Sequence, residues 1–409
     1  MPLSNHTKSR HSRRRRVLFA LITVCFSTIV SLCFVEVIFR ILEYRENSRI
    51  VNEGPGNHPL PDSRWGWKPS PGNFHTATSE FDVTGNVNSL WMNDAAYDPS
   101  AENKLIRILA LGDSHTFAVG VSANQTWPKV LQRKLNSLSG TDRYRVYNAG
   151  ESGYNMHQYL LRLIDQGPIV HPDYVLLGVS YATDLYDLLP PDRGGWEYGG
   201  ASERDYFDFD RNGALTLRHW KADTAAATKP RAASKVRGLL EYSATFRYLR
   251  RSSLALFIGS HVKISGQSLW PNMDVVLEKN VSAEHEYQWK LFGALLQRMK
   301  EECDRQSATL VVVGIPYLPQ VYDDVWDSTF AGNAAYSRTA AIERVEGECN
   351  KLRVAYVDTL APLRERSKEL GHWLHYAKDA HPTPEGQEAI AEAIVKDRVV
   401  EMRLANLNR

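Results

Sequence analysis

The sequence predicts an α/β protein, namely a three-layer α/β/α sandwich on a flavodoxin-like, five-stranded parallel sheet, preceded by one transmembrane helix. Three observations lead to this prediction. Short apolar runs alternate with amphipathic helical segments from about residue 105 onward. Glycine and small polar residues follow several of these runs. Near the amino terminus, a long uncharged apolar stretch comes directly after four consecutive arginines.

Five apolar runs have the length and composition of buried parallel strands. They cover 107–112, 144–150, 173–179, 309–316 and 353–359. Helices are predicted between them at 127–138, 157–165, 284–303 and 336–350, and a last helix begins at Pro384. Such connections are right-handed crossovers that cover both faces of the sheet. Ligands of these sheets bind at the carboxyl ends of the strands, where functional residues are therefore expected.

The N-terminal region has the pattern of an uncleaved membrane anchor. Residues 17–35 carry no charge and span about 28 Å as a helix, which suits a hydrocarbon core. A cleaved signal peptide has a shorter apolar region and a small-residue cleavage site, and neither is present here. The preceding arginines place the N-terminus in the cytoplasm. We therefore predict a basic cytoplasmic tail (1–16) and a single-pass anchor (17–42) in contact with lipid of the inner cell membrane, with the remaining chain periplasmic.

The remaining chain divides into an extension and a large domain. Residues 43–104 are rich in Pro, Gly, Asn and Asp, which predicts an irregular extension of loops and short strands. The α/β domain is expected at 105–405, with a turn-rich insertion at about 187–283 that acts as a lid, a substrate wall or a docking face. Six basic residues precede the first acidic one and account for the net charge of +2, so the rest of the chain is slightly acidic. This distribution argues against a nucleic-acid partner.

Two cysteines end predicted helices that each lead into an apolar strand. Helices on one side of a parallel sheet could bring Cys303 and Cys349 together, and a compartment outside the cytoplasm is oxidising. A disulfide between them is one hypothesis. Two buried free thiols are the alternative.

The first strand of the α/β domain ends in Gly-Asp-Ser-His-Thr, which places Ser114 between a strand and a helix. A serine at this point is either a nucleophile beside free helical N–H groups or an ordinary N-cap. Far along the chain, Asp379 and His381 lie two residues apart, just before the last helix. A nucleophilic serine needs a base, and the base needs an acid to orient it. We therefore predict a Ser114–His381–Asp379 triad, with ordinary loop residues as the alternative.

Four blocks of the sequence resemble the SGNH hydrolase superfamily, also called GDSL-like esterases. The blocks are "GDSHT", "NAGESGY", "SYATDL" and "KDAHPTPEGQ", and the resemblance covers about residues 105–400. It implies that Ser114 is the nucleophile, that Asp379 and His381 are the acid and the base, and that Ser114, Gly153 and Thr183 hold the oxyanion. The family usually has asparagine where Thr183 stands, and a threonine hydroxyl is a shorter donor. "ILEYR", "RWGWKPSPGNF" and "VNSLWMND" resemble the extension of membrane-anchored bacterial members.

Three further residues lie in the same blocks and are predicted to bind substrate, namely Asp113, Tyr154 and Asp184. Aromatic rings at a wet cleft often stack on sugars, and for any single ring such as that of Tyr154 packing in the core is the favoured alternative. No metal or other cofactor is predicted, because no His, Asp or Cys cluster has the spacing of a ligand set.

These features predict a membrane-anchored serine esterase that forms an acyl-enzyme, with O-acylated envelope carbohydrate as its substrate. If a sugar hydroxyl replaces water, the same site becomes that of an O-acyltransferase. In either case, a membrane acyltransferase is a possible partner. A rival from a different class is a non-catalytic member that binds glycans or scaffolds an assembly, and Thr183 is the feature that favours it.

Overall fold

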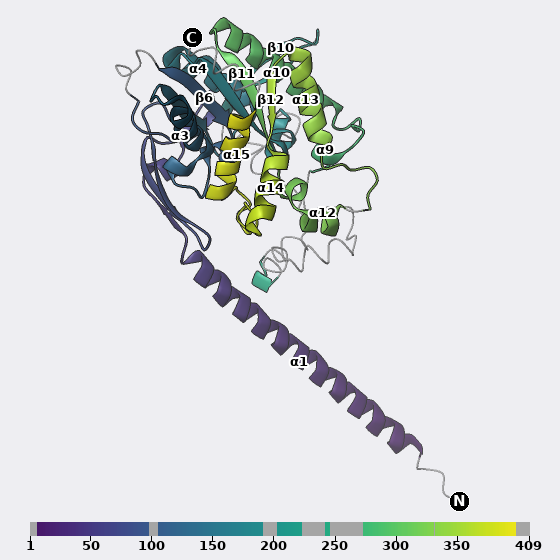
Figure 1. Cartoon of the computed structure of the whole chain (residues 1–409). Helices are drawn as coiled ribbons and strands as arrows, with labels where there is room; N and C mark the ends of the chain where they lie inside the picture. Colours follow the sequence, from purple (N-terminus) through teal and green to yellow (C-terminus); the bar gives the residue numbers. More distant parts are fainter. Residues whose placement is uncertain are drawn as a thin grey trace, which may run out of the picture. The chain divides into compact units, whose positions relative to one another are not determined.

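The computed structural model describes residues 6–97, 105–190, 203–222, 242–245, 273–330 and 332–397. The chain forms two compact units, one of residues 1–49 with 229–256 and one of residues 50–228 with 257–409. In the first unit, helix α1 (His6–Asn47) is one long continuous helix (Figure 1). Its part Arg15–Arg45 is long and apolar enough to cross a membrane, consistent with the predicted single-pass anchor.

Within this first unit, a short part of the insertion is bound to α1. The carboxylate of Glu36 accepts hydrogen bonds from the Ser243 hydroxyl (2.7 Å) and from the N–H groups of Ala244 (2.8 Å) and Thr245 (3.1 Å). One helical turn later, Arg40 donates to the carbonyl of Tyr242 (2.9 Å). The insertion therefore contacts the anchor helix through its backbone and through the hydroxyl of Ser243. Most of its remaining length, including 191–202, 223–241 and 246–272, lies outside the described residues.

The second unit contains the predicted five-stranded parallel sheet, in the order β12-β11-β8-β6-β7. Its strands are β6 (Ile106–Gly112), β7 (Tyr144–Gly150), β8 (Tyr174–Ser180), β11 (Thr309–Ile315) and β12 (Ala355–Asp358). Every residue of the central strand β8 is buried, because helices cover both faces of the sheet. After β6, the next strand β7 is added on one side of β6, and β8 is added on the other side. The carboxyl ends of β6 and β8, where the strand order reverses, are therefore the expected ligand site.

Among the described residues, six long helices form the outer layers. On one face, α3 (Trp127–Ser139) packs against α15 (Pro384–Lys396), and α14 (Leu360–Leu370) lies beside α15 (Figure 1). On the other face, α10 (Glu286–Arg305) packs between α4 (Met156–Val170) and α13 (Ala340–Leu352). Short helices are α2 (Ser114–Phe117), α5 (Tyr181–Asp184), α9 (Asp274–Leu277), α11 (Leu318–Val321) and α12 (Asp323–Thr329), with 3-10 turns η1 (Pro55–Asn57), η3 (Ala123–Gln125) and η4 (Tyr186–Leu188). The predicted three-layer sandwich is confirmed.

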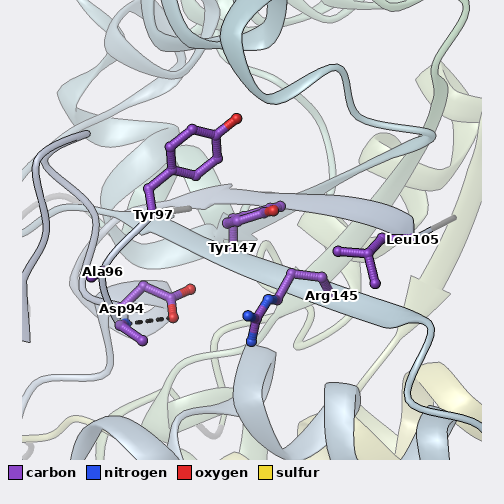
Figure 2. A pocket seen from close by; sticks show the side chains of 7 residues that line it. Asp94, Ala96, Tyr97, Leu105, Arg145 and Tyr147 are labelled. Carbon is purple, nitrogen blue, oxygen red and sulfur yellow. Dashed lines mark hydrogen bonds between the residues drawn. The ribbon is translucent and has the colours of Figure 1, made fainter. Parts of the chain in front are cut away.

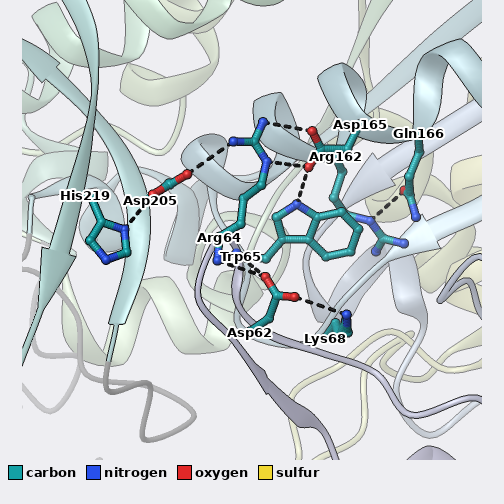
Figure 3. Close-up of polar contacts among 9 residues, drawn as sticks. All are labelled: Asp62, Arg64, Trp65, Lys68, Arg162, Asp165, Gln166, Asp205 and His219. Carbon is teal, nitrogen blue, oxygen red and sulfur yellow. Dashed lines mark hydrogen bonds and ion pairs between the residues drawn. The ribbon is translucent and has the colours of Figure 1, made fainter.

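The extension forms small antiparallel sheets on this unit. Strands β1 (Val51–Glu53), β4 (Gly72–Ala77) and β5 (Asp82–Val87) form one sheet, and β2 (Leu60–Asp62) pairs with β3 (Gly66–Lys68). In Figure 3, Arg64 reaches from this region to Asp165 of α4 (2.7 Å) and to Asp205 (3.2 Å) of the insertion hairpin β9 (Glu203–Phe209)–β10 (Leu215–Lys221). The Trp65 indole also donates to Asp165 (2.8 Å). The extension is thus tied to the α/β core by specific polar contacts.

The hypothesis of a disulfide is wrong, because Cys303 and Cys349 are both free thiols. Each belongs to the apolar face of its own helix and is fully buried in the core. Burial raises the pKa of each thiol to about 12, so both remain protonated and unreactive.

Candidate active site

The nucleophile turn follows β6 directly. Asp113 is the N-cap of α2, since its carboxylate accepts a hydrogen bond from the backbone N–H of His115 (2.8 Å). Ser114 is the first helical residue and is partly exposed. The alternative that Ser114 is an ordinary cap is therefore wrong. Because Asp113 performs the capping, the Ser114 hydroxyl is left for other contacts.

Two strand-end glycines allow this turn to lie directly on the sheet. A Cβ atom on Gly112 would approach the Thr116 hydroxyl to 2.1 Å, and one on Gly150 would approach the backbone nitrogen of Phe117 to 2.2 Å. Contacts this short do not occur in folded proteins, so any side chain at either position would displace α2. The glycines at the ends of β6 and β7 thus fix where Ser114 stands.

The predicted triad residues come together at this edge of the sheet. The His381 Nε2 atom lies 2.7 Å from the Ser114 hydroxyl, and its Nδ1 atom is hydrogen-bonded to Asp379 Oδ1. Burial opposes the charge on Asp379, but the hydrogen bond and charge of His381 outweigh it and lower the pKa of this carboxyl below its usual value. Asp379 is therefore ionised at neutral pH and can hold the imidazole with Nε2 towards the serine.

The backbone amides of Ser114 and Gly153 are the two predicted oxyanion donors. Gly153 lies in the loop after β7 with a left-handed φ of 74°, a conformation that favours glycine. Within the described residues, neither its N–H nor that of Ser114 donates a hydrogen bond. Their role as oxyanion donors stays a prediction, and backbone N–H groups are the usual donors in acyl transfer.

Thr183, predicted as a third oxyanion donor, has a different partner. Its hydroxyl donates to Asp113 Oδ2 at 2.7 Å. A threonine hydroxyl has one proton, so in this arrangement the side chain cannot also donate to an oxyanion. This corrects the sequence-based assignment. Thr183 instead links the turn after β8 to the cap of the nucleophile helix.

Replacement of Thr183 by valine separates these two roles. We expect Thr183→Val to lower thermal stability, because the buried Asp113 carboxylate loses a donor worth about 1–3 kcal/mol. The catalytic rate should fall less than about tenfold, whereas loss of an oxyanion donor typically costs about 10²–10³-fold. Melting temperature and kcat measured on the same preparation test this. A rate loss above 100-fold without loss of stability would restore the oxyanion role.

The three predicted substrate-binding residues are turned into the protein, and this prediction is wrong. Asp113, Tyr154 and Asp184 are each at most 1% exposed. The Tyr154 hydroxyl donates to the carbonyl of Trp67, and Asp184 accepts hydrogen bonds from the Tyr159 hydroxyl (2.6 Å) and the Ser180 N–H (2.8 Å). Burial, reinforced by the Asp113 charge, raises the pKa of Asp184 well above its usual value. These side chains fix the loops at the strand ends and do not face a substrate.

One residue beside the triad was not assigned from the sequence. His115 is 4% exposed, and its ring lies 5.0 Å from the ring of His381. Its Nδ1 atom is 3.2 Å from Asp113 Oδ2. The sequence places the loop of His381 beside α2, but neither the burial of His115 nor the direction of its ring follows from its position after Ser114.

The loop after β7 that contains Gly153 also contains a buried acidic residue, Glu151. Glu151 is 6% exposed, and burial raises its pKa from 4.5 to about 8, although the charge of Arg162 works in the opposite direction. At a pH between these two pKa values, Glu151 keeps its proton in the folded protein, whereas the same side chain has released it in the unfolded chain. Stability therefore falls as the pH rises from 4.5 to 8.

We expect Glu151→Gln to remove this pH dependence. The variant should melt at least about 3 °C higher than the wild type at pH 8, corresponding to roughly 1 kcal/mol, and the gap should narrow at pH 5. Differential scanning fluorimetry from pH 5 to 8 measures it. A gap that widens towards pH 5 would contradict the assignment.

Other features of the unit lie apart from the triad. A small pocket (Figure 2) is lined by Asp94, Tyr97, Leu105, Arg145 and Tyr147, which come from the chain before β6 and from β7, and it contains none of the triad residues. Among the residues that the structure describes, no group of three or more His, Cys, Asp or Glu side chains is arranged to hold a metal ion.

No protein-family model matches the chain, and no curated protein matches it. Several solved structures are similar at low identity. A catalytic mutant of an acetylxylan esterase from Geobacillus stearothermophilus matches with a TM-score of 0.37 and 12% identity, over 72% of this chain and 95% of that chain. The esterase EstA from Pseudoalteromonas sp. matches with a TM-score of 0.34 and 12% identity, over 74% of this chain and 99% of that chain. A member of the lipolytic protein G-D-S-L family from Veillonella parvula matches with a TM-score of 0.35 and 10% identity, over 71% of this chain and 96% of that chain. Similarity of this extent assigns neither a family nor an activity to the chain.

Proposed function

We propose that the chain is a membrane-anchored serine esterase of the SGNH type. The observation that carries the proposal is the continuous hydrogen-bonded row of Ser114, His381 and Asp379 at the carboxyl edge of the sheet. The long apolar helix α1 and the four sequence blocks described above support the anchor and the enzyme type.

In this proposal, acylation begins when His381 Nε2 takes the proton of the Ser114 hydroxyl as the oxygen attacks the ester carbonyl. The amides of Ser114 and Gly153 stabilise the oxyanion of the tetrahedral intermediate. As the C–O bond to the alcohol breaks, the imidazolium gives its proton to the departing alkoxide. Water then attacks the acyl-enzyme by the same route, which releases the acid and regenerates the serine.

The proposed substrate is O-acylated carbohydrate of the cell envelope, reached from the periplasmic side of the inner membrane. The apolar helix that follows a basic N-terminal tail supports this location. A membrane acyltransferase that esterifies envelope carbohydrate would supply such a substrate and is the proposed partner. The likeness to a family of esterases is an argument by analogy for the substrate class.

The test uses the full chain purified in detergent, with Ser114→Ala as the matched control. Acetate release is measured from p-nitrophenyl acetate and from acetylated polysaccharide, and a fluorophosphonate probe reports the nucleophile. Labelling of the wild type alone, with faster release from the polysaccharide, supports the proposal. Identical behaviour of the two proteins would refute the serine esterase and favour the non-catalytic alternative. Transfer of acetate to an added sugar would identify an acyltransferase.

A further inference from the structure

The turn that joins β4 to β5 in the extension has a fixed shape. Thr78 donates its backbone N–H to the carbonyl of Phe81 (2.8 Å). The Thr78 hydroxyl oxygen accepts hydrogen bonds from the N–H groups of Glu80 (3.1 Å) and Phe81 (3.3 Å). These bonds hold the backbone on both sides of Glu80, so its side chain leaves the turn from a defined position.

The carboxylate of Glu80 binds the loop that carries the catalytic acid. One oxygen accepts the N–H of Lys378 (3.0 Å), and the other accepts that of Asp379 (3.0 Å). The Lys378 ammonium group also donates to the hydroxyl of Ser79 (3.1 Å). Hydrogen bonds from N–H groups to a carboxylate are stronger than those to a neutral acceptor. Two successive amides, ending with that of Asp379, are therefore held by one side chain.

The loop bound in this way is strained. Ala380, between the catalytic acid and base, has a left-handed φ of 69°, which is unfavourable for a residue with a Cβ atom. Inside the loop, Tyr376 donates its N–H to the His381 carbonyl (2.9 Å), and Ala380 donates to the Tyr376 carbonyl (3.0 Å). These bonds close the loop, and Glu80 accepts the backbone N–H groups of Lys378 and Asp379 from outside it.

Packing of rings adds to this contact. Phe81 lies against Tyr376, with ring centroids 5.2 Å apart, and the Tyr376 hydroxyl donates to the carbonyl of Gly120 (2.7 Å). A Cβ atom on Gly120 would come within 2.8 Å of both rings. The turn of the extension, the catalytic loop and the segment just after the nucleophile helix thus meet at one place.

We propose that Glu80 is a positioning residue of the active site, which holds the Asp379 backbone so that the carboxylate stays aligned with His381 Nδ1. The inference rests on the proposed function, and it gives the extension a role in catalysis. Without Glu80, the strained loop can relax, and the imidazole loses its fixed orientation towards Ser114. A misplacement of about 1 Å can reduce a catalytic rate by about 10²-fold.

The first test compares Glu80→Ala and Glu80→Gln with Asp82→Asn. Asp82 lies on the same hairpin, is exposed and pairs with His75, away from the catalytic loop. For Glu80→Ala we expect kcat to fall about 10- to 100-fold with KM nearly unchanged. Glu80→Gln should recover part of the loss, because its amide oxygen still accepts a hydrogen bond. Asp82→Asn should match the wild type.

A double-mutant cycle distinguishes positioning from general destabilisation. If Glu80 acts through Asp379, then Glu80→Ala should change the residual rate of Asp379→Ala by less than about twofold. Loss by the same factor in both backgrounds, or an unchanged kcat for Glu80→Ala, would overturn the inference. Melting temperatures of all variants show whether each assay is run on folded protein.

A readout without turnover separates this inference from the proposed function. In the full chain labelled with ¹⁵N-histidine, the proton between His381 Nδ1 and Asp379 should give a low-field resonance. Glu80→Ala should broaden or shift it, and Asp82→Asn should leave it in place. If Glu80→Ala changes the resonance but the wild type hydrolyses no ester, the esterase is refuted and the positioning role is retained. A resonance insensitive to Glu80→Ala would refute the positioning role alone.

Discussion

Replacement of Ser114 by alanine is expected to lower kcat/KM for an activated ester by about 10⁴- to 10⁶-fold, which leaves at most a background rate. The physical reason is that the acyl-enzyme cannot form without the hydroxyl that lies 2.7 Å from His381 Nε2. The fold should be unaffected, since Asp113 and not Ser114 caps α2. The melting temperature of the variant should therefore stay within about 2 °C of the wild type.

The measurement combines initial rates with fluorophosphonate labelling and mass mapping of the labelled peptide. Ser122→Ala is a suitable control, because Ser122 follows the same helix and its side chain makes no capping hydrogen bond. That variant should label and turn over like the wild type. A label that persists in Ser114→Ala would show that a different residue is the nucleophile.

Replacement of Asp379 by asparagine is the second large effect that we expect, at about 10⁴-fold in kcat. An asparagine keeps the size of the side chain but can donate its amide N–H to His381 Nδ1. The imidazole would then carry its proton on Nε2, where it cannot accept the proton of Ser114. Substrate affinity should change little, because Asp379 contacts the imidazole and not the ester.

The experiment measures kcat and KM of Asp379→Asn beside Asp142→Asn, a change at an exposed loop position that should have no effect. Labelling of Ser114 by fluorophosphonate should slow in parallel with kcat, since both depend on the same proton transfer. An Asp379→Asn enzyme within tenfold of the wild type would show that another group orients the imidazole. His115, whose ring lies beside that of His381, would be the first to examine.

The strands could be predicted from sequence because burial on both faces leaves a clear signature. A strand such as β8 is apolar at nearly every position, and only a sheet covered by helices makes that pattern stable. Helix α14 was not predicted. Its sequence LAPLRERSKEL buries only Leu360 and Leu363, so most of its surface is polar and the helical period is weak.

The triad could be predicted for a related reason. Ser114 follows a strand of the sheet directly, and Asp379 and His381 come just before a helix that packs on it, so topology alone brings them to one edge. The partner of Thr183 could not be predicted, since a hydroxyl rotates towards whichever acceptor the fold supplies. Glu80 was missed because it lies 299 positions from Asp379, and no local pattern marks such a contact.

The capping of α2 by Asp113 has a consequence for protein engineering. Position 114 supports neither the helix cap nor the packing on the sheet, because Asp113 supplies the first and the strand-end glycines permit the second. The chemical identity of the nucleophile is thereby uncoupled from the architecture of the turn. A thiol or selenol introduced at residue 114 would lie beside the same imidazole in an otherwise unaltered fold. The nucleophile could therefore be exchanged to obtain new acyl-transfer chemistry.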